Sequence, residues 1–221
     1  MRKLALLIGA ALAGAAMGVT TSSGARDVLW SIVESCLDPS AVSSYCARCP
    51  VPLVGQCPGK TGCRDTTEVW AVTPEYVAIR DSKMCGCPAG FTHGLAMPRA
   101  PVTGVEDRRR PDGLWPFAWE VARARMPDDV DIALVVNPPD QRGQDQLHIH
   151  IVRLKPDARR ALERRQPAKL QRLEDVWTAA GRDAASKGLR AYGILVARDD
   201  GGYLMVTDAG NLERQWTVAR C

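Results

Sequence analysis

The sequence predicts an α+β domain built on an antiparallel sheet. Two observations carry this expectation. The apolar runs 131–137 and 146–154 are joined by an eight-residue connection, which favours an antiparallel pair. Near the end of the chain, the strand-like runs 189–197 and 203–207 flank Asp199-Asp200-Gly201-Gly202, a strong hairpin signal. Helical segments elsewhere in the chain complete the α+β class.

Three segments are predicted to be helical. Apolar residues recur at helical spacing in 26–37, which indicates an amphipathic helix. A second helix is expected over 114–126, where Pro116 fits the first turn. The charged region 157–187 is also helical in character and is interrupted near Gln166.

The remaining segments read as short strands and loops. Strands are expected at 67–72 and 76–80, and a third apolar run covers 91–97. Residues 38–65 are loop-rich, and the basic stretch 99–113 is expected to be a surface loop.

Composition excludes some classes of protein. Of the 221 residues, 46% are hydrophobic and 24% charged, which is typical of a globular chain and not of a disordered one. The net charge of +4 suits an anionic ligand, but the basic residues are scattered and no Lys/Arg run is interleaved with aromatic residues. Nucleic acid is therefore not an expected partner.

The N-terminus resembles an export signal. Arg2 and Lys3 precede an apolar run over 4–18, about fifteen residues long, whereas a membrane span needs about twenty. Residues 1–25 are therefore expected to be a signal peptide or an N-terminal membrane anchor, and 26–221 the functional domain. The protein is expected to be exported, either periplasmic or anchored to the outer face of the inner membrane.

The cysteine content agrees with export. Half of the cysteines lie in the Pro/Gly-rich stretch 46–63. This stretch has little core of its own and would need covalent cross-links to be stable. A zinc site starting from Cys46 and Cys49 is the alternative, but the spacing Cys85-x-Cys87 does not fit a zinc knuckle, so disulfides are favoured. The eight cysteines are Cys36, Cys46, Cys49, Cys57, Cys63, Cys85, Cys87 and Cys221.

Two of the three histidines stand at alternate positions of one predicted strand. Residues two apart in a strand point to the same face, so Gln146, His148, His150 and Val152 share one face and apolar residues fill the other. This polar row is expected to meet water or a ligand.

Paired imidazoles suit phosphate chemistry. A neutral imidazole can attack phosphorus, while its neighbour donates a hydrogen bond to a phosphoryl oxygen. The preceding loop, 141–145, contains a glycine and several donors and could cradle an anion.

Two other interpretations of the same pattern stay open. His148 and His150 could both bind one zinc ion, with His93, Asp145 or Glu106 as a third ligand. The histidines could also be incidental to function.

Several motifs resemble the histidine-triad (HIT) superfamily. Val135-Val136-Asn137, then Gln144, then His148-Ile149-His150-Ile151 resemble its signature, and Thr92 to Pro98 resemble the strand before it. Within this superfamily the chain is most similar to the CDP-diacylglycerol pyrophosphatase family, over about 26–211. The further motifs of that likeness are Leu29 to Val33 with Cys36-Leu37, Gly104-Val105-Glu106, Phe117-Ala118-Trp119 and Tyr192 to Val196.

The resemblance implies a HIT-like antiparallel sheet with flanking helices, to which a cysteine-rich insert is added. It implies hydrolysis of CDP-diacylglycerol to CMP and phosphatidate through a histidine nucleophile, with no cofactor and no metal. Asn137 would orient the nucleotide or an imidazole, and Gln144 would donate to a phosphate oxygen. Gln146 and His93 are the other expected substrate-binding residues.

The chain departs from the full triad, because Gln146 and Val152 flank the two histidines. If Val152 replaces the third member, His150 is the nucleophile; if Gln146 replaces the first, His148 is. The spacing from Asn137 and Gln144 favours His150.

The resemblance leaves open the substrate, the function and the roles of the cysteines and of one arginine run. A soluble nucleotide is an alternative substrate, and a non-catalytic, disulfide-rich protein that binds nucleotide or metal is an alternative function. The cysteine-rich segment 46–63 and Cys85-x-Cys87 are expected to form local disulfides. Arg108-Arg109-Arg110 is expected to be either a solvated loop or a contact with an anionic membrane surface.

Overall fold

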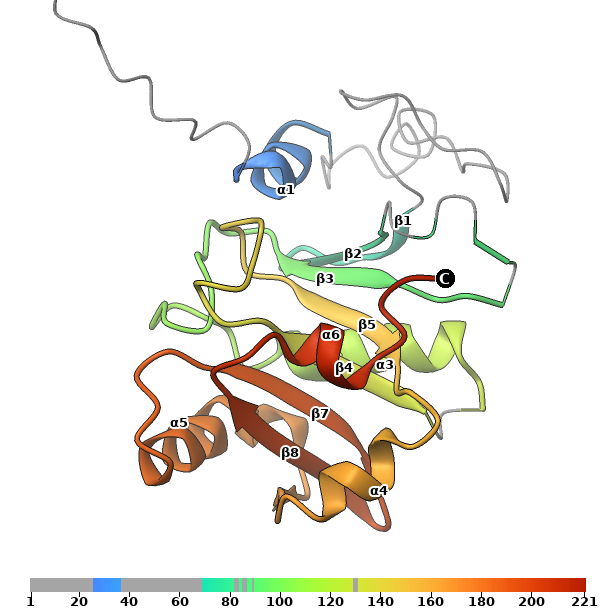
Figure 1. Cartoon of the computed structure of the whole chain (residues 1–221). Helices are drawn as coiled ribbons and strands as arrows, with labels where there is room; N and C mark the ends of the chain where they lie inside the picture. Colours follow the sequence, from blue (N-terminus) through green and yellow to red (C-terminus); the bar gives the residue numbers. More distant parts are fainter. Residues whose placement is uncertain (1–25, 37–68, 82–83, 85–86, 89, 129–130) are drawn as a thin grey trace, which may run out of the picture.

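The computed structural model describes residues 26–36, 69–81, 84, 87–88, 90–128 and 131–221. Within these residues the strands form one eight-stranded sheet in the order β1-β2-β3-β5-β4-β7-β8-β6, with all neighbours antiparallel (Figure 1). The predicted α+β class and the antiparallel pairing are therefore confirmed. The strands are β1 (Val69–Val72), β2 (Tyr76–Arg80), β3 (Gly94–Pro98), β4 (Ile132–Val136), β5 (Ile149–Arg153), β6 (Ala168–Leu170), β7 (Gly193–Asp199) and β8 (Gly202–Asp208).

The helices are short, apart from two. The longest are α3 (Leu114–Arg125) and α5 (Val176–Ser186). The others are α1 (Val28–Ser31), which continues as a π-helical turn over Ile32–Cys36, then α4 (Ala158–Glu163), the 3-10 turn Leu173–Asp175, and α6 (Leu212–Trp216).

One face of the sheet is covered by α3 and α5. Alternate residues of the central strands, such as Leu134 of β4 and Ile151 of β5, are fully buried against these helices. Trp115 of α3 and Trp177 of α5 meet edge to face in the same core, with ring centroids 5.1 Å apart. This face holds the largest apolar cluster and carries no histidine of the described residues.

The opposite face carries two smaller apolar clusters. In the first, α4 and α6 pack over the β4, β7 and β8 side of the sheet, through residues that include Val135 and Leu195. In the second, α1 packs over β2 and β3, through residues that include Leu95 (Figure 1). His150 of β5 pairs with Leu95 on one side and Val135 on the other, so its side chain lies between these two clusters. This position defines the candidate site.

Several predicted boundaries need correction. Strand β5 begins at Ile149, so Gln146, which lies in a bend, and His148 come before it. The predicted loop 99–113 is not wholly at the surface, because Val102 and Val105 are buried in the main core. Strand β6 and helix α6 were not predicted. The hairpin is confirmed, and Gly201 takes the positive φ of 77° that the tight turn requires.

Some predictions fall on residues outside those described. They include the signal or anchor in 1–25 and the cysteine-rich stretch 46–63. Among the described residues, no helix is long and apolar enough to cross a membrane. The HIT-like character of the sheet stays a prediction.

Candidate functional site

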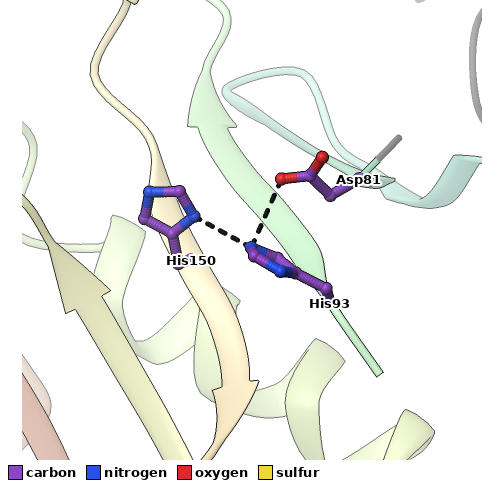
Figure 2. A group of neighbouring side chains, drawn as sticks. All are labelled: Asp81, His93 and His150. Carbon is purple, nitrogen blue, oxygen red and sulfur yellow. Dashed lines mark hydrogen bonds and ion pairs between the residues drawn. The ribbon is translucent and has the colours of Figure 1, made fainter. Parts of the chain in front are cut away.

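Three strands bring the core of the site together. His150 lies in β5, His93 immediately precedes β3, and Asp81 immediately follows β2 (Figure 2). The backbone N–H of Asp81 donates to the carbonyl of His93 at 2.8 Å, which extends the β2–β3 ladder by one pair. Antiparallel pairing therefore places residues far apart in sequence at one point on the sheet.

His93 is the centre of this group. Its Nε2 lies 3.1 Å from His150 Nδ1 and 3.3 Å from Asp81 Oδ2 (Figure 2). On the other side of the ring, His93 Nδ1 lies 3.1 Å from the carbonyl oxygen of Ala219. A carbonyl can only accept, so Nδ1 carries a proton and donates it to Ala219.

Glu213 of α6 adds a second carboxylate. Its Oε2 lies 3.3 Å from His150 Nε2 and accepts a 2.9 Å hydrogen bond from Asn137 Nδ2. Its Oε1 lies 3.5 Å from His93 Nε2. Asn137, just after β4, thus contacts the histidine cluster through Glu213 and lies 3.5 Å from His150 Nε2. Sequence reasoning missed Glu213, because nothing in the short polar segment around it predicts that it folds back over the sheet.

The cluster is buried. His93 is 0% exposed, and His150, Asp81, Asn137 and Glu213 are between 4% and 7% exposed. Gln146 and His148 are also buried. The row therefore does not face open water in this structure, and the other part of the prediction, contact with a ligand, stays a prediction.

His148 is held differently from His150. Its Nδ1 lies 2.7 Å from the backbone carbonyl of Gln146, so Nδ1 carries the proton and the lone pair of the neutral ring lies on Nε2. The rings of His148 and His150 meet edge to face, with centroids 4.8 Å apart. The two predicted catalytic histidines are thus neighbours.

The two glutamines expected to bind substrate hold backbone groups in this structure. Gln146 Nε2 donates to the carbonyls of Pro98 and Ala100, at 2.8 and 3.0 Å. Gln144 Oε1 accepts from the N–H of Leu29 at 3.0 Å, which ties the loop to α1. Their predicted contacts with substrate stay predictions.

Charged side chains of the loop before β5 form ion pairs. Arg142 donates to both carboxylate oxygens of Glu106, at 2.9 and 2.6 Å. Arg26 donates to both oxygens of Asp145, and this hydrogen bonding holds the pKa of Asp145 below its usual range. Glu106 and Asp145, two candidate metal ligands from the sequence, are therefore paired with arginines. Within the described residues, Asp81 groups with His93 and His150 as a set of candidate metal ligands.

The C-terminal segment closes the site. A disulfide joins Cys87, in the segment between Asp81 and His93, to Cys221, at a sequence separation of 134 residues. The bond is long-range, so the local stapling expected for Cys87 is wrong. Beside this segment opens a pocket of about 630 Å³. It is lined by Lys155, Asn211, Glu213, Arg214, Thr217, Val218, Ala219 and Arg220.

The side chain of Asn211 caps helix α6, which presents Glu213. It accepts from the N–H of Arg214 at 2.8 Å, and its Nδ2 also donates to the Gln141 carbonyl at 3.2 Å. We expect Asn211→Ala to lower the free energy of unfolding by about 1 kcal/mol, measured by urea denaturation. Asn211→Asp, which keeps the cap, is the control; equal losses in both variants would contradict the assignment.

The fold and site define an α+β protein in which two neighbouring histidines of one sheet meet two buried carboxylates, an arrangement suited to nucleophilic chemistry. Residues 24–183 match the family described as CDP-diacylglycerol pyrophosphatase. The chain belongs to this family, as the histidine motifs predicted. The matched range ends before α6, so Glu213 lies outside it.

One curated relative gives a finer comparison. The chain is similar to the CDP-diacylglycerol pyrophosphatase of Yersinia pestis, with 39% identity over 112 residues. The alignment covers 40% of this chain and 43% of the relative, so it spans less than half of the relative's length.

Proposed function

We propose that this protein hydrolyses the phosphoanhydride bond of CDP-diacylglycerol to give CMP and phosphatidate, with His148 as the nucleophile. Membership of the CDP-diacylglycerol pyrophosphatase family supports the reaction and the substrate. The likeness to the Yersinia pestis protein of that name supports the same assignment.

One contact carries the choice of nucleophile. The 2.7 Å hydrogen bond from His148 Nδ1 to the Gln146 carbonyl fixes the tautomer and directs the lone pair through Nε2, as attack on phosphorus requires. Both nitrogens of His150 lie beside buried groups, 3.1 Å from His93 and 3.3 Å from Glu213. This geometry favours the alternative register, in which Gln146 replaces the first histidine of the triad, over the His150 preferred from sequence spacing.

The proposed reaction has two steps. His148 Nε2 attacks the phosphorus on the CMP side, and the P–O bond to the second phosphate breaks, so that phosphatidate leaves with the bonding electrons. Water then attacks the same phosphorus and the P–N bond breaks. CMP is released and neutral His148 is regenerated. Because phosphatidate is a weak base, it can leave without the general acid that an amine leaving group needs.

The neighbouring groups would orient the reactants. We assign Asn137 to holding Glu213 and thereby the His150 ring, on the strength of the 2.9 Å bond to Oε2. Gln146 would act through its backbone carbonyl on His148. His93 would act indirectly, by holding the His150 ring. Gln144 would also act indirectly, by holding the loop before β5 against α1.

Export and contact with a membrane surface belong to the same proposal. The long-range disulfide agrees with an oxidising compartment outside the cytoplasm. A lipid nucleotide must be met at a bilayer, and Arg108 is an exposed cation for that contact. Its neighbours are engaged within the protein, Arg109 with the Asp107 carboxylate and Arg110 with the Asp107 carbonyl.

The test is an assay of the purified chain with CDP-diacylglycerol in detergent micelles. We expect release of CMP and phosphatidate in equal amounts. Activity only on CDP-alcohols without acyl chains would favour a soluble substrate. No turnover of either by a folded protein that binds CMP would favour a non-catalytic binding protein.

A further inference from the structure

We propose that His93, His150 and Asp81 form a binding site for one divalent transition metal ion, and that Zn²⁺ fits it best. The family resemblance led us to expect no metal, although the histidine pattern alone left a zinc site open. The three side chains offer ligand atoms that all lie within 4.8 Å of one another, and all three residues are buried (Figure 2). The inference does not depend on the substrate proposed above.

The tautomer of His93 is the first argument. Its Nδ1 donates to the Ala219 carbonyl, so in the neutral ring Nε2 is an unprotonated acceptor. That nitrogen points at a carboxylate oxygen of Asp81, 3.3 Å away, and at a second one of Glu213, 3.5 Å away. A lone pair that faces two carboxylates is an arrangement that a cation bound between them would stabilise.

His150 repeats the pattern. Its Nε2 lies 3.3 Å from Glu213 Oε2, so a proton on Nε2 has a carboxylate to accept it. Its Nδ1 then carries the lone pair and faces His93 Nε2 at 3.1 Å. Histidines that bind metals characteristically donate their second N–H to a carbonyl or a carboxylate. Both histidines meet that requirement here, and their other nitrogens converge on one point.

The two separations measured from His93 fit a tetrahedral ion. Ligand atoms about 2.0–2.1 Å from Zn²⁺ lie about 3.4 Å from one another. From His93 Nε2 the measured distances are 3.1 Å to His150 Nδ1 and 3.3 Å to Asp81 Oδ2. Three protein ligands are the number found at catalytic zinc sites, where water or substrate takes the fourth position.

The experiment measures metal in the untagged full-length protein after dialysis against Zn²⁺ and removal of the excess. We expect about one equivalent per chain in the wild type, and less than about a tenth as much in Asp81→Asn and His93→Gln. His148→Ala is the matched control, because this neighbouring histidine donates to Gln146 and is not a ligand; it is expected to keep the metal.

A second readout tests the geometry. Replacement of the ion by Co²⁺ is expected to give the visible absorption of a tetrahedral complex with nitrogen and oxygen ligands, lost in the Asp81→Asn variant. Circular dichroism checks that the variants are folded. A wild type that binds neither ion overturns the proposal. So does a wild type whose bound metal is unchanged by both ligand substitutions, since that metal would be held elsewhere, for example by cysteines.

Discussion

Replacing His148 by alanine is expected to lower the rate of CMP release by at least about a thousandfold, because removal of a nucleophile abolishes the covalent route and leaves only substrate binding and charge stabilisation. The fold is expected to survive. The hydrogen bond lost is a local one to the Gln146 carbonyl, and β5 begins only after His148. Turnover is measured with CDP-diacylglycerol in micelles, and folding by thermal unfolding.

The same substitution allows the covalent step to be examined. With substrate labelled at the phosphorus next to cytidine, the wild type is expected to yield labelled protein in a rapid alkaline quench, as a base-stable phosphoramidate. The His148→Ala variant is expected to remain unlabelled. His150→Ala is the comparison: if it loses the label while His148→Ala keeps both label and turnover, His150 is the nucleophile, as the sequence spacing favoured.

Loss of the Cys87–Cys221 disulfide is expected to lower the free energy of unfolding by about 2–5 kcal/mol. The bond has a sequence separation of 134 residues, and in the chain-entropy account long loops gain the most from closure. Activity is expected to fall as well, since the Ala219 carbonyl that binds His93 lies two residues before Cys221. Cys221→Ser is the variant, and denaturant unfolding the measurement.

A double substitution is the control for the disulfide. Cys87→Ser and Cys221→Ser remove the same bond, so the double variant is expected to be no less stable than either single variant. Additive losses would mean that each cysteine contributes through separate contacts. A loss below about 1 kcal/mol in the single variants would contradict the expected contribution of the closed loop.

Much of the fold could be predicted because its signals are local. The alternation around His148 and His150 predicted that their side chains lie together. The residues Asp199 to Gly202 predicted the β7–β8 hairpin, with its glycine at positive φ. Strand β6 has only three residues, Ala168–Leu170, and follows Gln166, whose φ is 54°. So short a strand gives too little alternation to be recognised, and its pairing with β8 depends on tertiary contacts.

The candidate site could be predicted only in part, for a similar reason. Its histidines stand out by type and spacing, whereas Asp81 and Glu213 are ordinary acidic residues in sequence. Their role arises from long-range pairing of β2 with β3 and from α6 folding back over the sheet. Alternation identified the polar row, for which water or a ligand was expected, but not that the row is buried. A period of two identifies a face but not what packs on it.

The order of the strands bears on how the protein assembles. Strand β5 lies between β3 and β4, so β3 reaches the centre of the sheet only through its pairing with β5. Because His93 and His150 are 57 residues apart in sequence, their contact is expected to form later than the local β7–β8 hairpin. During refolding, sheet formation can be followed before any active centre exists. Recovery of activity is then expected to lag behind the circular dichroism signal and to be the slowest phase observed.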